Sequence, residues 1–320
     1  MPKVSILTPC YRCENYIGAT LASVRDQELP DWEHIVVDDG SPDDGAMIIE
    51  TAAKIDPRIR LIRQQNGGVA KARNVAFAQA APDSEYLLFL DADDCLEPSM
   101  LAEMTAYLEK RPEVGMVYCA PSLIDEAGNA LDREPATIGW SARYIPCGWT
   151  VCRIPDEKPE TPFCSLYAAT TVVPSISLIR RSIYERTRLW DEDFGHLYED
   201  LDVFLQIALL SKVHFLKRKL VRYRYHPEQS TANREKLHLQ EEKLYQKWDR
   251  LQPSLPLEQQ RVVEAAKRFR EHRMIPISGW RGGIRSWQVG KRMQAIRFWI
   301  GAGRRYLASL FTPMRVEGGA

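Results

Sequence analysis

The sequence predicts an α/β fold in which a mixed, mostly parallel sheet is flanked by helices, and three observations lead to this prediction. Short apolar runs bounded by polar residues, typical of buried strands, recur up to about residue 225. Segments with helical periodicity lie between most of these runs, and strands that alternate with helices are typical of βαβ units. The composition, with 45% hydrophobic and 27% charged residues, is that of an ordinary globular protein.

The elements expected in the first part of the chain alternate regularly. Strands are predicted over residues 4–7, 34–37, 59–62, 86–90 and 115–119, and helices over residues 14–26, 69–80 and 98–109. A further helix is expected to start at Ser41-Pro42-Asp43-Asp44, because an N-cap candidate precedes a proline and two acids that the helix dipole favours. Asp125 to Asn129 has the residues of a hairpin turn.

The pattern changes farther along the chain. Residues 134–170 show no periodicity, and a long irregular segment in a compact domain is usually functional or mobile. The elements expected after it are strands over 176–179, 213–216 and 220–225, a helix over 201–210, and helices near 234–250, 257–272 and 286–311. Because the strands stop, we predict a boundary near residue 235 and a helical, basic region over residues 235–320.

Charge and cysteine content limit the classes of protein. The formal net charge is zero, which gives no reason to expect nucleic acid as a partner, and no apolar run is long enough to span a bilayer. There are seven cysteines, an odd number, and no secretory leader is recognised in the sequence. Both observations favour reduced thiols and a cytoplasmic location. Cys10-x-x-Cys13 is compatible with a redox or zinc motif, but zinc needs a second ligand pair, so we interpret both as structural thiols.

Acidic residues lie at the ends of three expected elements. Asp91 and Asp93 follow the apolar run Leu87–Leu90, Asp38-Asp39 ends the second strand, and Glu199-Asp200 begins a helix. In an open α/β sheet such residues meet at the carboxyl ends of the strands, where ligands bind. Two neighbouring carboxylates favour a divalent cation, although a lone Asp-x-Asp is more often a solvated turn that caps a helix.

Six segments, taken in order, resemble the motifs of family 2 glycosyltransferases with the GT-A fold. They are Val4-Ser-Ile-Leu-Thr-Pro-Cys-Tyr11, Val36-Val-Asp38-Asp39-Gly-Ser41, Gly68-Val-Ala-Lys-Ala-Arg73-Asn74, Phe89-Leu-Asp91-Ala-Asp93-Asp94, Glu199-Asp200 and Arg224-Tyr-His226. The resemblance covers roughly residues 1–232. It implies a Rossmann-like GT-A domain over residues 1–234, with a nucleotide-binding half to about residue 120 and an acceptor-side half beyond it, followed by a C-terminal helical extension.

The resemblance also implies an activity, namely the inverting, metal-dependent transfer of a sugar from a nucleotide-diphosphate donor to a hydroxyl group. UDP is the commonest nucleotide in the family, and the implied acceptor is a saccharide or lipid-linked saccharide in polysaccharide or glycoconjugate biosynthesis. Such a reaction needs one carboxylate for the nucleotide, one for the cation that neutralises the diphosphate, and one as general base.

Carried over residue by residue, the resemblance assigns the nucleotide-sugar site to Thr8, Pro9, Tyr11, Asp38, Asp39, Arg73, Asp91 and Ala92. Asp39 is expected to contact the base, Arg73 the nucleotide or its phosphates, and Asp91 the ribose and donor sugar. Both Asp38 and Arg73 also have a purely structural interpretation. Asp38 could belong to a turn that caps a helix, and Arg73 could be an exposed helix residue. Arg12 replaces an asparagine that is common in the family's first loop, so this loop leaves the base open.

The remaining assignments concern the cation and the acceptor. The resemblance implies that Asp93 and His226 bind Mn²⁺ or Mg²⁺ and that Asp200 is the general base. A surface location is an equally good explanation of a single loop histidine such as His226. Asp200 could instead be an acid favoured at a helix N-terminus, and Glu199 is as well explained by a structural role as by a functional one.

The segment from Met274 to Arg315 contains basic residues and no acidic ones. Two explanations are equally compatible with this pattern. Residues 281–315 could form an amphipathic helix in peripheral contact with the inner face of the membrane, or a helix packed on the catalytic domain with a solvated basic face.

Other classes of protein fit the pattern less well. A haloacid dehalogenase-type hydrolase has its Asp-x-Asp near the first strand, and a dinucleotide-binding dehydrogenase needs a Gly-x-Gly-x-x-Gly there, which is absent. The main alternative is a non-catalytic carbohydrate-binding or scaffold protein with the GT-A fold. The presence of Asp91, Asp93 and Asp200 argues against it.

Overall fold

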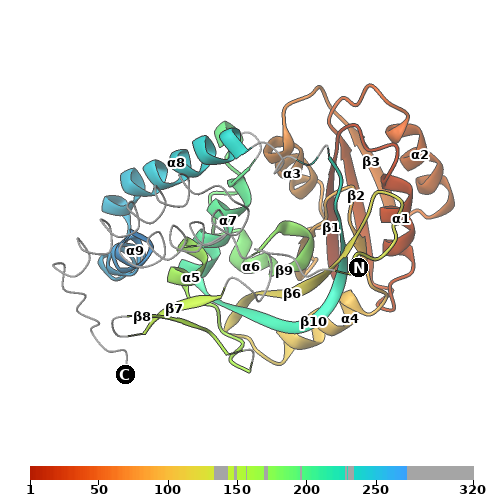
Figure 1. Ribbon diagram of the computed structural model, residues 1–320. Coiled ribbons are helices and arrows are strands. Elements are labelled where there is room, and N and C mark those ends of the chain that lie inside the picture. The colour runs from red at the N-terminus through yellow and green to blue at the C-terminus, as the bar shows by residue number, and fades with distance from the viewer. Residues whose placement is uncertain are drawn as a thin grey trace.

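A curved sheet runs through the molecule. The computed structural model describes residues 1–132, 143–147, 150–155, 157–168, 172–194, 197–227, 229 and 234–271. In these ranges the sheet has the order β3-β2-β1-β4-β9-β6-β10-β5 (Figure 1). Its strands are β1 (Val4–Cys10), β2 (Trp32–Asp38), β3 (Ile59–Arg63), β4 (Tyr86–Phe89), β5 (Cys95–Leu96), β6 (Val114–Ile124), β9 (Ser177–Arg180) and β10 (Lys212–Arg224).

The strands on either side of β9 run in one direction. β2 is parallel to β1 and β3, β1 is parallel to β4, and β10 is parallel to β6. β9 is antiparallel to both β4 and β6, and the short β5 is antiparallel to β10. The carboxyl ends of the parallel strands therefore meet at one edge of the sheet, the usual location of ligand sites in such folds.

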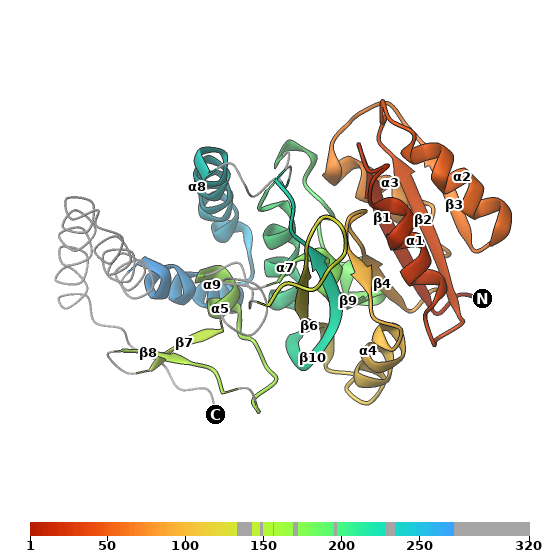
Figure 2. The same cartoon turned by 45° about the vertical axis from the view of Figure 1, so that its right-hand side comes forward.

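Helices cover both faces of the first half of the sheet. These helices are α1 (Ile17–Arg25), α2 (Gly45–Ile55) and α3 (Val69–Ala78), whereas α4 (Met100–Glu109) packs against β6, β9 and β10 of the second half. α1 and α2 lie on one side of β1 and β2, and α3 lies on the other (Figures 1 and 2). Because both faces are covered, β2 and β4 are buried along their whole length.

The second half is more helical. It contains α5 (Phe163–Ala168), α6 (Arg181–Tyr184), α7 (Glu199–Leu210), α8 (Arg234–Leu251) and α9 (Leu257–Phe269). α8 and α9 lie on the opposite side of the molecule from α1 and α2 (Figure 1). Leu244, Trp248 and Val263 of these two helices belong to the same buried cluster as the sheet residues. The described C-terminal helices thus extend the core of the sheet, and the boundary near residue 235 stays a prediction.

The observed sheet and its flanking helices confirm the predicted fold class, but three predicted elements were wrong in detail. The strands expected over 213–216 and 220–225 form the single strand β10, because its exposed residues 217–219 bulge outward while the pairing with β6 continues. Residues 134–170 are not wholly irregular, since β7 (Tyr144–Cys147) pairs with β8 (Thr150–Arg153) before α5. The helix expected from Ser41 begins at Gly45.

The predicted helix over residues 286–311 and the basic segment 281–315 lie outside the described residues. Within the described ranges, no helix combines the length and the apolar character needed to cross a membrane.

A buried polar contact attaches α8 to α7. Asp202 of α7 is fully buried, and its Oδ1 atom accepts a hydrogen bond from Trp248 Nε1 at 3.0 Å. Its Oδ2 atom accepts one from Gln206 Nε2 at 3.0 Å and lies 2.8 Å from Lys247 Nζ. Since every hydrogen bond to a buried carboxylate offsets its desolvation, these partners allow Asp202 to remain inside the core.

We expect Asp202→Ala to lower the free energy of unfolding by about 3 kcal/mol, because Lys247 then loses its buried partner and the Trp248 N–H group is left unpaired. Urea denaturation measures the change. The matched control is Asp193→Ala, which removes an exposed carboxylate and should change the stability by less than about 0.5 kcal/mol. Equal destabilisation by the two variants contradicts this account of how α8 is attached.

Candidate active site

Arg73, on α3, brings two of the acidic segments together. Its Nη2 atom lies 2.8 Å from Asp91 Oδ1, and its Nη1 atom lies 3.0 Å from Glu199 Oε1. The Trp190 ring covers the guanidinium with 4.4 Å between its centroid and Cζ. Burial lowers the pKa of this guanidinium, but the two carboxylates outweigh burial and raise the pKa of Arg73. The side chain, only 3% exposed, is thus a shared buried cation and not an exposed helix residue.

Asp91 follows β4 and lies between Arg73 and the other acids of the turn. Its backbone N–H donates to Ser175 Oγ at 3.1 Å, which fixes the start of the turn. Burial raises the pKa of the Asp91 carboxyl group, and the charge of Arg73 opposes this rise. The side chain is 30% exposed, so it can still reach a ligand. Ala92, next to it, is buried, and its carbonyl accepts a hydrogen bond from Thr20 Oγ1 at 2.8 Å.

Asp93 and His226 meet across the turn. The distance from Asp93 Oδ2 to His226 Nε2 is 3.0 Å, and the His226 ring lies against Tyr16 with 4.9 Å between centroids. His226 is 8% exposed, which excludes the surface location considered for it. The sheet sets this geometry, because Arg224 at the end of β10 donates from Nε to the Asp93 carbonyl and from its backbone N–H to Asp94 Oδ1.

The pair formed by Asp93 and His226 fits part of a site for a divalent cation. In the described ranges, no group of three or more His, Cys, Asp and Glu side chains is arranged to hold a metal ion. Mg²⁺ is commonly bound by one or two carboxylates together with substrate phosphates and water. For Mn²⁺, an imidazole nitrogen is an acceptable ligand, although oxygen ligands suit this ion better. Asp93 and His226 therefore suit a cation whose coordination the substrate completes.

Asp200 lies in the first turn of α7, next to the Glu199 that binds Arg73. Burial and then the negative charge of Glu199 raise the pKa of Asp200 to about 7, against the opposing effect of Arg73. Its Oδ1 atom accepts a hydrogen bond from the Leu201 N–H at 2.7 Å. A carboxylate with a pKa near 7 can accept a proton from a substrate and release it again at neutral pH.

The backbone before Asp200 is strained. Leu197 and Tyr198 have φ angles of 86° and 67°, in the left-handed region that residues with a Cβ atom rarely adopt. Such strain persists only where the surrounding structure imposes it, and it is common at functional sites. Here it precedes the helix start that carries both Glu199 and Asp200.

The side chains of the first loop, residues 8–11, offer fewer contacts for a nucleotide than the sequence predicts. Thr8 is fully buried, and its hydroxyl lies 2.8 Å from Nε2 of His34, whose pKa is lowered to about 3 by burial. The Thr8 side chain is therefore not available to a nucleotide. Pro9 is half-buried, and Tyr11 is 45% exposed with the Arg12 guanidinium 5.4 Å from its ring centroid. Tyr11 is therefore the side chain of this loop that is best placed for an incoming base.

The expectation of reduced thiols is wrong for two residues of this loop. Cys10 and Cys13 form a disulfide that closes the loop around Tyr11 and Arg12. Cys95, Cys119 and Cys164 are free thiols in the described part of the chain.

The carboxylates of Asp38 and Asp39 both accept hydrogen bonds from backbone N–H groups. Asp38 Oδ1 accepts a hydrogen bond from the Ser41 N–H at 3.0 Å, as expected for a residue that closes a turn. The Asp39 carboxylate, 3% exposed, accepts hydrogen bonds from the N–H groups of Gly67 and Gly68, both at 2.8 Å. Gly68 has φ +91°, which suits glycine. Asp39 thus fixes the loop that leads into α3.

The sequence did not indicate two residues of the site, Trp190 and Ser175, and it left the role of a third, Glu199, open. Trp190 stacks on Arg73, Ser175 accepts from the Asp91 backbone, and Glu199 balances half of the Arg73 ion pairs. Only Glu199 carried a signal, because it precedes Asp200 in a motif, but nothing in that motif identifies its partner.

The chain is similar to known glycosyltransferases. The profile of Glycosyl transferase family 2 matches residues 5–188. A putative teichuronic acid biosynthesis glycosyltransferase of Bacillus subtilis, TuaG, is 37% identical over 133 residues, which are 41% of this chain and 52% of that protein. The putative glycosyltransferase EpsH of the same organism is 34% identical over 70% of this chain and 61% of its own length. The chain thus spans about half to three fifths of these relatives.

Solved structures show the fold. The crystal structure of Staphylococcus aureus TarS residues 1–349 superposes with a TM-score of 0.56 at 18% identity, covering 99% of this chain and 95% of that one. Complexes of the same TarS fragment with UDP and with UDP-GlcNAc both superpose with a TM-score of 0.54. This likeness confirms the GT-A fold expected from the resemblance. Since the family profile matches more than half of the 320 residues, the chain belongs to glycosyl transferase family 2.

Proposed function

We propose that the chain is an inverting, metal-dependent glycosyltransferase that moves a sugar from a UDP-sugar to a hydroxyl group of a saccharide or lipid-linked saccharide in polysaccharide biosynthesis. The observation that carries the proposal is the carboxyl of Asp200, with a pKa of about 7, beside the ion-paired Arg73 and Asp91. Relatives named for teichuronic acid biosynthesis and the TarS complexes with UDP and UDP-GlcNAc support the choice of substrate class.

In the proposed reaction Asp200 acts on the acceptor. Its carboxylate takes the proton of the acceptor hydroxyl while the hydroxyl oxygen forms a bond to the anomeric carbon of the donor sugar. The bond from that carbon to the diphosphate oxygen breaks, and its electron pair leaves with the nucleoside diphosphate. Because the attack comes from the side opposite the leaving group, the configuration inverts and no covalent sugar–enzyme intermediate forms.

The other residues bind and orient the donor. Asp91, held by Arg73, accepts hydrogen bonds from hydroxyl groups of the ribose and donor sugar, and Tyr11 stacks on the base. Asp39 keeps the loop before α3 in position for the nucleotide. Asp93 and His226 hold Mn²⁺ or Mg²⁺. When bound, this cation neutralises the diphosphate that departs.

Asp200→Asn should reduce transfer by roughly 10²–10⁴-fold, since the amide cannot accept the acceptor proton, and should leave donor affinity nearly unchanged. UDP release and calorimetric titration of the donor measure the two quantities. Asp193→Asn, an exposed change seven positions before the base, serves as the control. Loss of nucleotide affinity in Asp200→Asn is inconsistent with the role of base.

Asp93→Ala should abolish the dependence of donor binding on Mn²⁺ or Mg²⁺, because one of two protein ligands is removed and His226 loses its partner. Isothermal titration with UDP, with and without the cation, measures it. Unchanged metal dependence in the variant eliminates Asp93 as a ligand.

The value of kcat/KM should rise with pH to a plateau, with a midpoint well above pH 4 and no higher than about pH 7. The base acts only when ionised, and a bound cation can lower its pKa but not raise it. In Glu199→Gln the midpoint should move to lower pH, because one of the charges that raise the pKa of Asp200 is removed. A midpoint near pH 4 in the unmodified chain, or a shift to higher pH in the variant, contradicts the assignment.

A further inference from the structure

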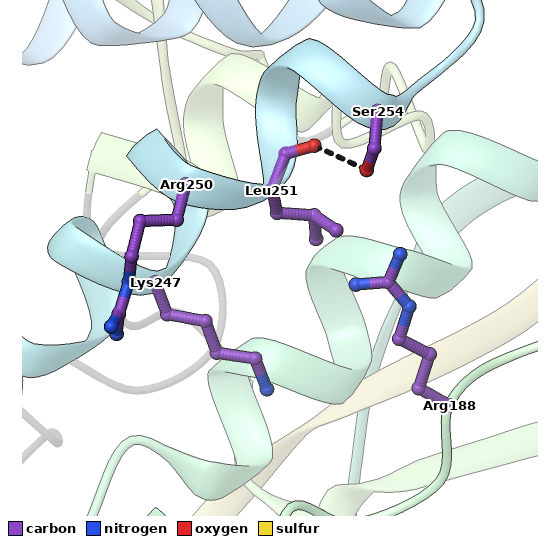
Figure 3. A pocket seen from close by; sticks show the side chains of 5 residues that line it. All are labelled: Arg188, Lys247, Arg250, Leu251 and Ser254. Carbon is purple, nitrogen blue, oxygen red and sulfur yellow. Dashed lines mark hydrogen bonds between the residues drawn. The ribbon is translucent and has the colours of Figure 1, made fainter.

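An open hollow lies where the loop before α7 meets the end of α8, and the proposed reaction makes no use of it. Its volume is about 380 Å³, and it is lined by Arg188, Lys247, Arg250, Leu251 and Ser254 (Figure 3). The hollow is open to solvent, and most of its lining residues are exposed, so it suits a ligand group that stays partly in water. The lining combines cationic side chains with one apolar side chain and contains no acidic residue. We refer to it as the Arg188 hollow.

The cations of the hollow differ in their partners. Lys247 Nζ lies 2.6 Å from Asp191 Oδ2 and 2.8 Å from Asp202 Oδ2, so its charge is already balanced. The side chains of Arg188 and Arg250 form no ion pair or hydrogen bond with any residue in the described ranges. Arg250 stabilises the C-terminal end of α8 as a cation in its last turn. Arg188 is an exposed loop residue, and its guanidinium is not at a helix end.

Figure 3 shows how these side chains lie. The guanidinium of Arg188 points into the hollow from one side, and Lys247 extends toward the same space from the other. The Leu251 side chain lies between them, whereas Arg250 points away at the rim. An unpaired guanidinium that faces an apolar side chain across an open space matches a ligand with one anionic group and a less polar body.

The backbone that carries Arg188 is fixed in advance of any ligand. The Arg188 N–H donates to Gln206 Oε1 at 2.7 Å, and Gln206 Nε2 donates to the buried Asp202 at 3.0 Å. Gln206 is itself only 9% exposed. The position from which the Arg188 side chain extends is therefore fixed, and no backbone ordering is needed when a ligand binds.

The hollow is near the reaction centre but separate from it. Trp190, which stacks on Arg73, is two residues from Arg188, so their Cα atoms are at most about 7 Å apart. On the other wall, Asp202 binds Lys247, and it lies two residues after Asp200 on the same helix. Two positions on a helix are roughly 200° apart, so the base and the hollow lie on different faces of α7.

We propose that the Arg188 hollow binds an anionic group of the acceptor glycan, a phosphate or a carboxylate, at a distance from the hydroxyl that reacts. The inference rests on the proposed function, because it identifies the ligand as part of the acceptor. The planar fork of an arginine matches phosphate and carboxylate oxygens equally, with two parallel N–H donors. Leu251 offers the apolar contact for a sugar ring beside the charged group.

Titration of the full chain with labelled probes tests the proposal. The probes are a short inorganic polyphosphate, a hyaluronan oligosaccharide that carries carboxylates, and neutral dextran, at a salt concentration that screens weak surface attraction. Polyphosphate or hyaluronan should bind and dextran should not, and the better of the two identifies the anionic group. Arg188→Ala should weaken that binding by roughly tenfold or more, as expected for one charge-assisted hydrogen-bonded contact.

Two controls make the result specific. Arg186→Ala removes an exposed arginine of the same segment that does not line the hollow, and it should bind as the unmodified chain does. Absence of anion binding, or equal weakening in Arg186→Ala and Arg188→Ala, overturns the proposal. UDP titration with Mn²⁺ should give the same affinity in both variants. Failure of the unmodified chain to bind UDP counts against the proposed transfer, whereas the anion titration does not involve the donor.

Discussion

The double ion pair of Arg73 with Asp91 and Glu199 is the interaction on which the rest of the site depends. It joins α3, the turn after β4 and the first turn of α7, and its two partners are 18 and 126 positions away in the sequence. A buried cation with two buried or half-buried carboxylates is stable only as a set, because removal of one member leaves an uncompensated charge. The geometry of the acids is therefore determined by the fold and not by a ligand.

This network also explains why two neighbouring carboxyl groups differ. Glu199 is the ion-pair partner of Arg73, while Asp200 forms no ion pair with any residue that the structure describes and lies next to the negative charge of Glu199. Burial and that charge together raise its pKa to about 7. In the turn after β4, Asp93 pairs with His226. The position of this pair depends on Arg224 at the end of β10. The turn after β4 thus carries both Asp93, which pairs with His226, and Asp91, which belongs to the Arg73 network beside Asp200.

The sequence predicted the sheet and the positions of the acidic residues at the ends of its elements, because apolar runs are local signals. It did not predict that the Thr8 side chain faces the core, since both faces of a parallel sheet are covered and alternation carries no information there. Two strands were predicted in place of β10, because residues 217–219 are charged. In the structure, backbone pairing with β6 continues past these residues. The partners of Arg73 and Asp39 could not be predicted, because pairing over such separations depends on tertiary packing.

The central claim is that the Arg73 network leaves Asp200 as a carboxyl group that titrates near neutral pH. Carbon-13 NMR of the full chain with labelled aspartate, assigned with Asp200→Asn and titrated without metal or nucleotide, measures this pKa directly. The account predicts a carboxyl resonance, absent from the variant, with a midpoint near pH 7. A midpoint near pH 4, the value of an unperturbed aspartate, contradicts it.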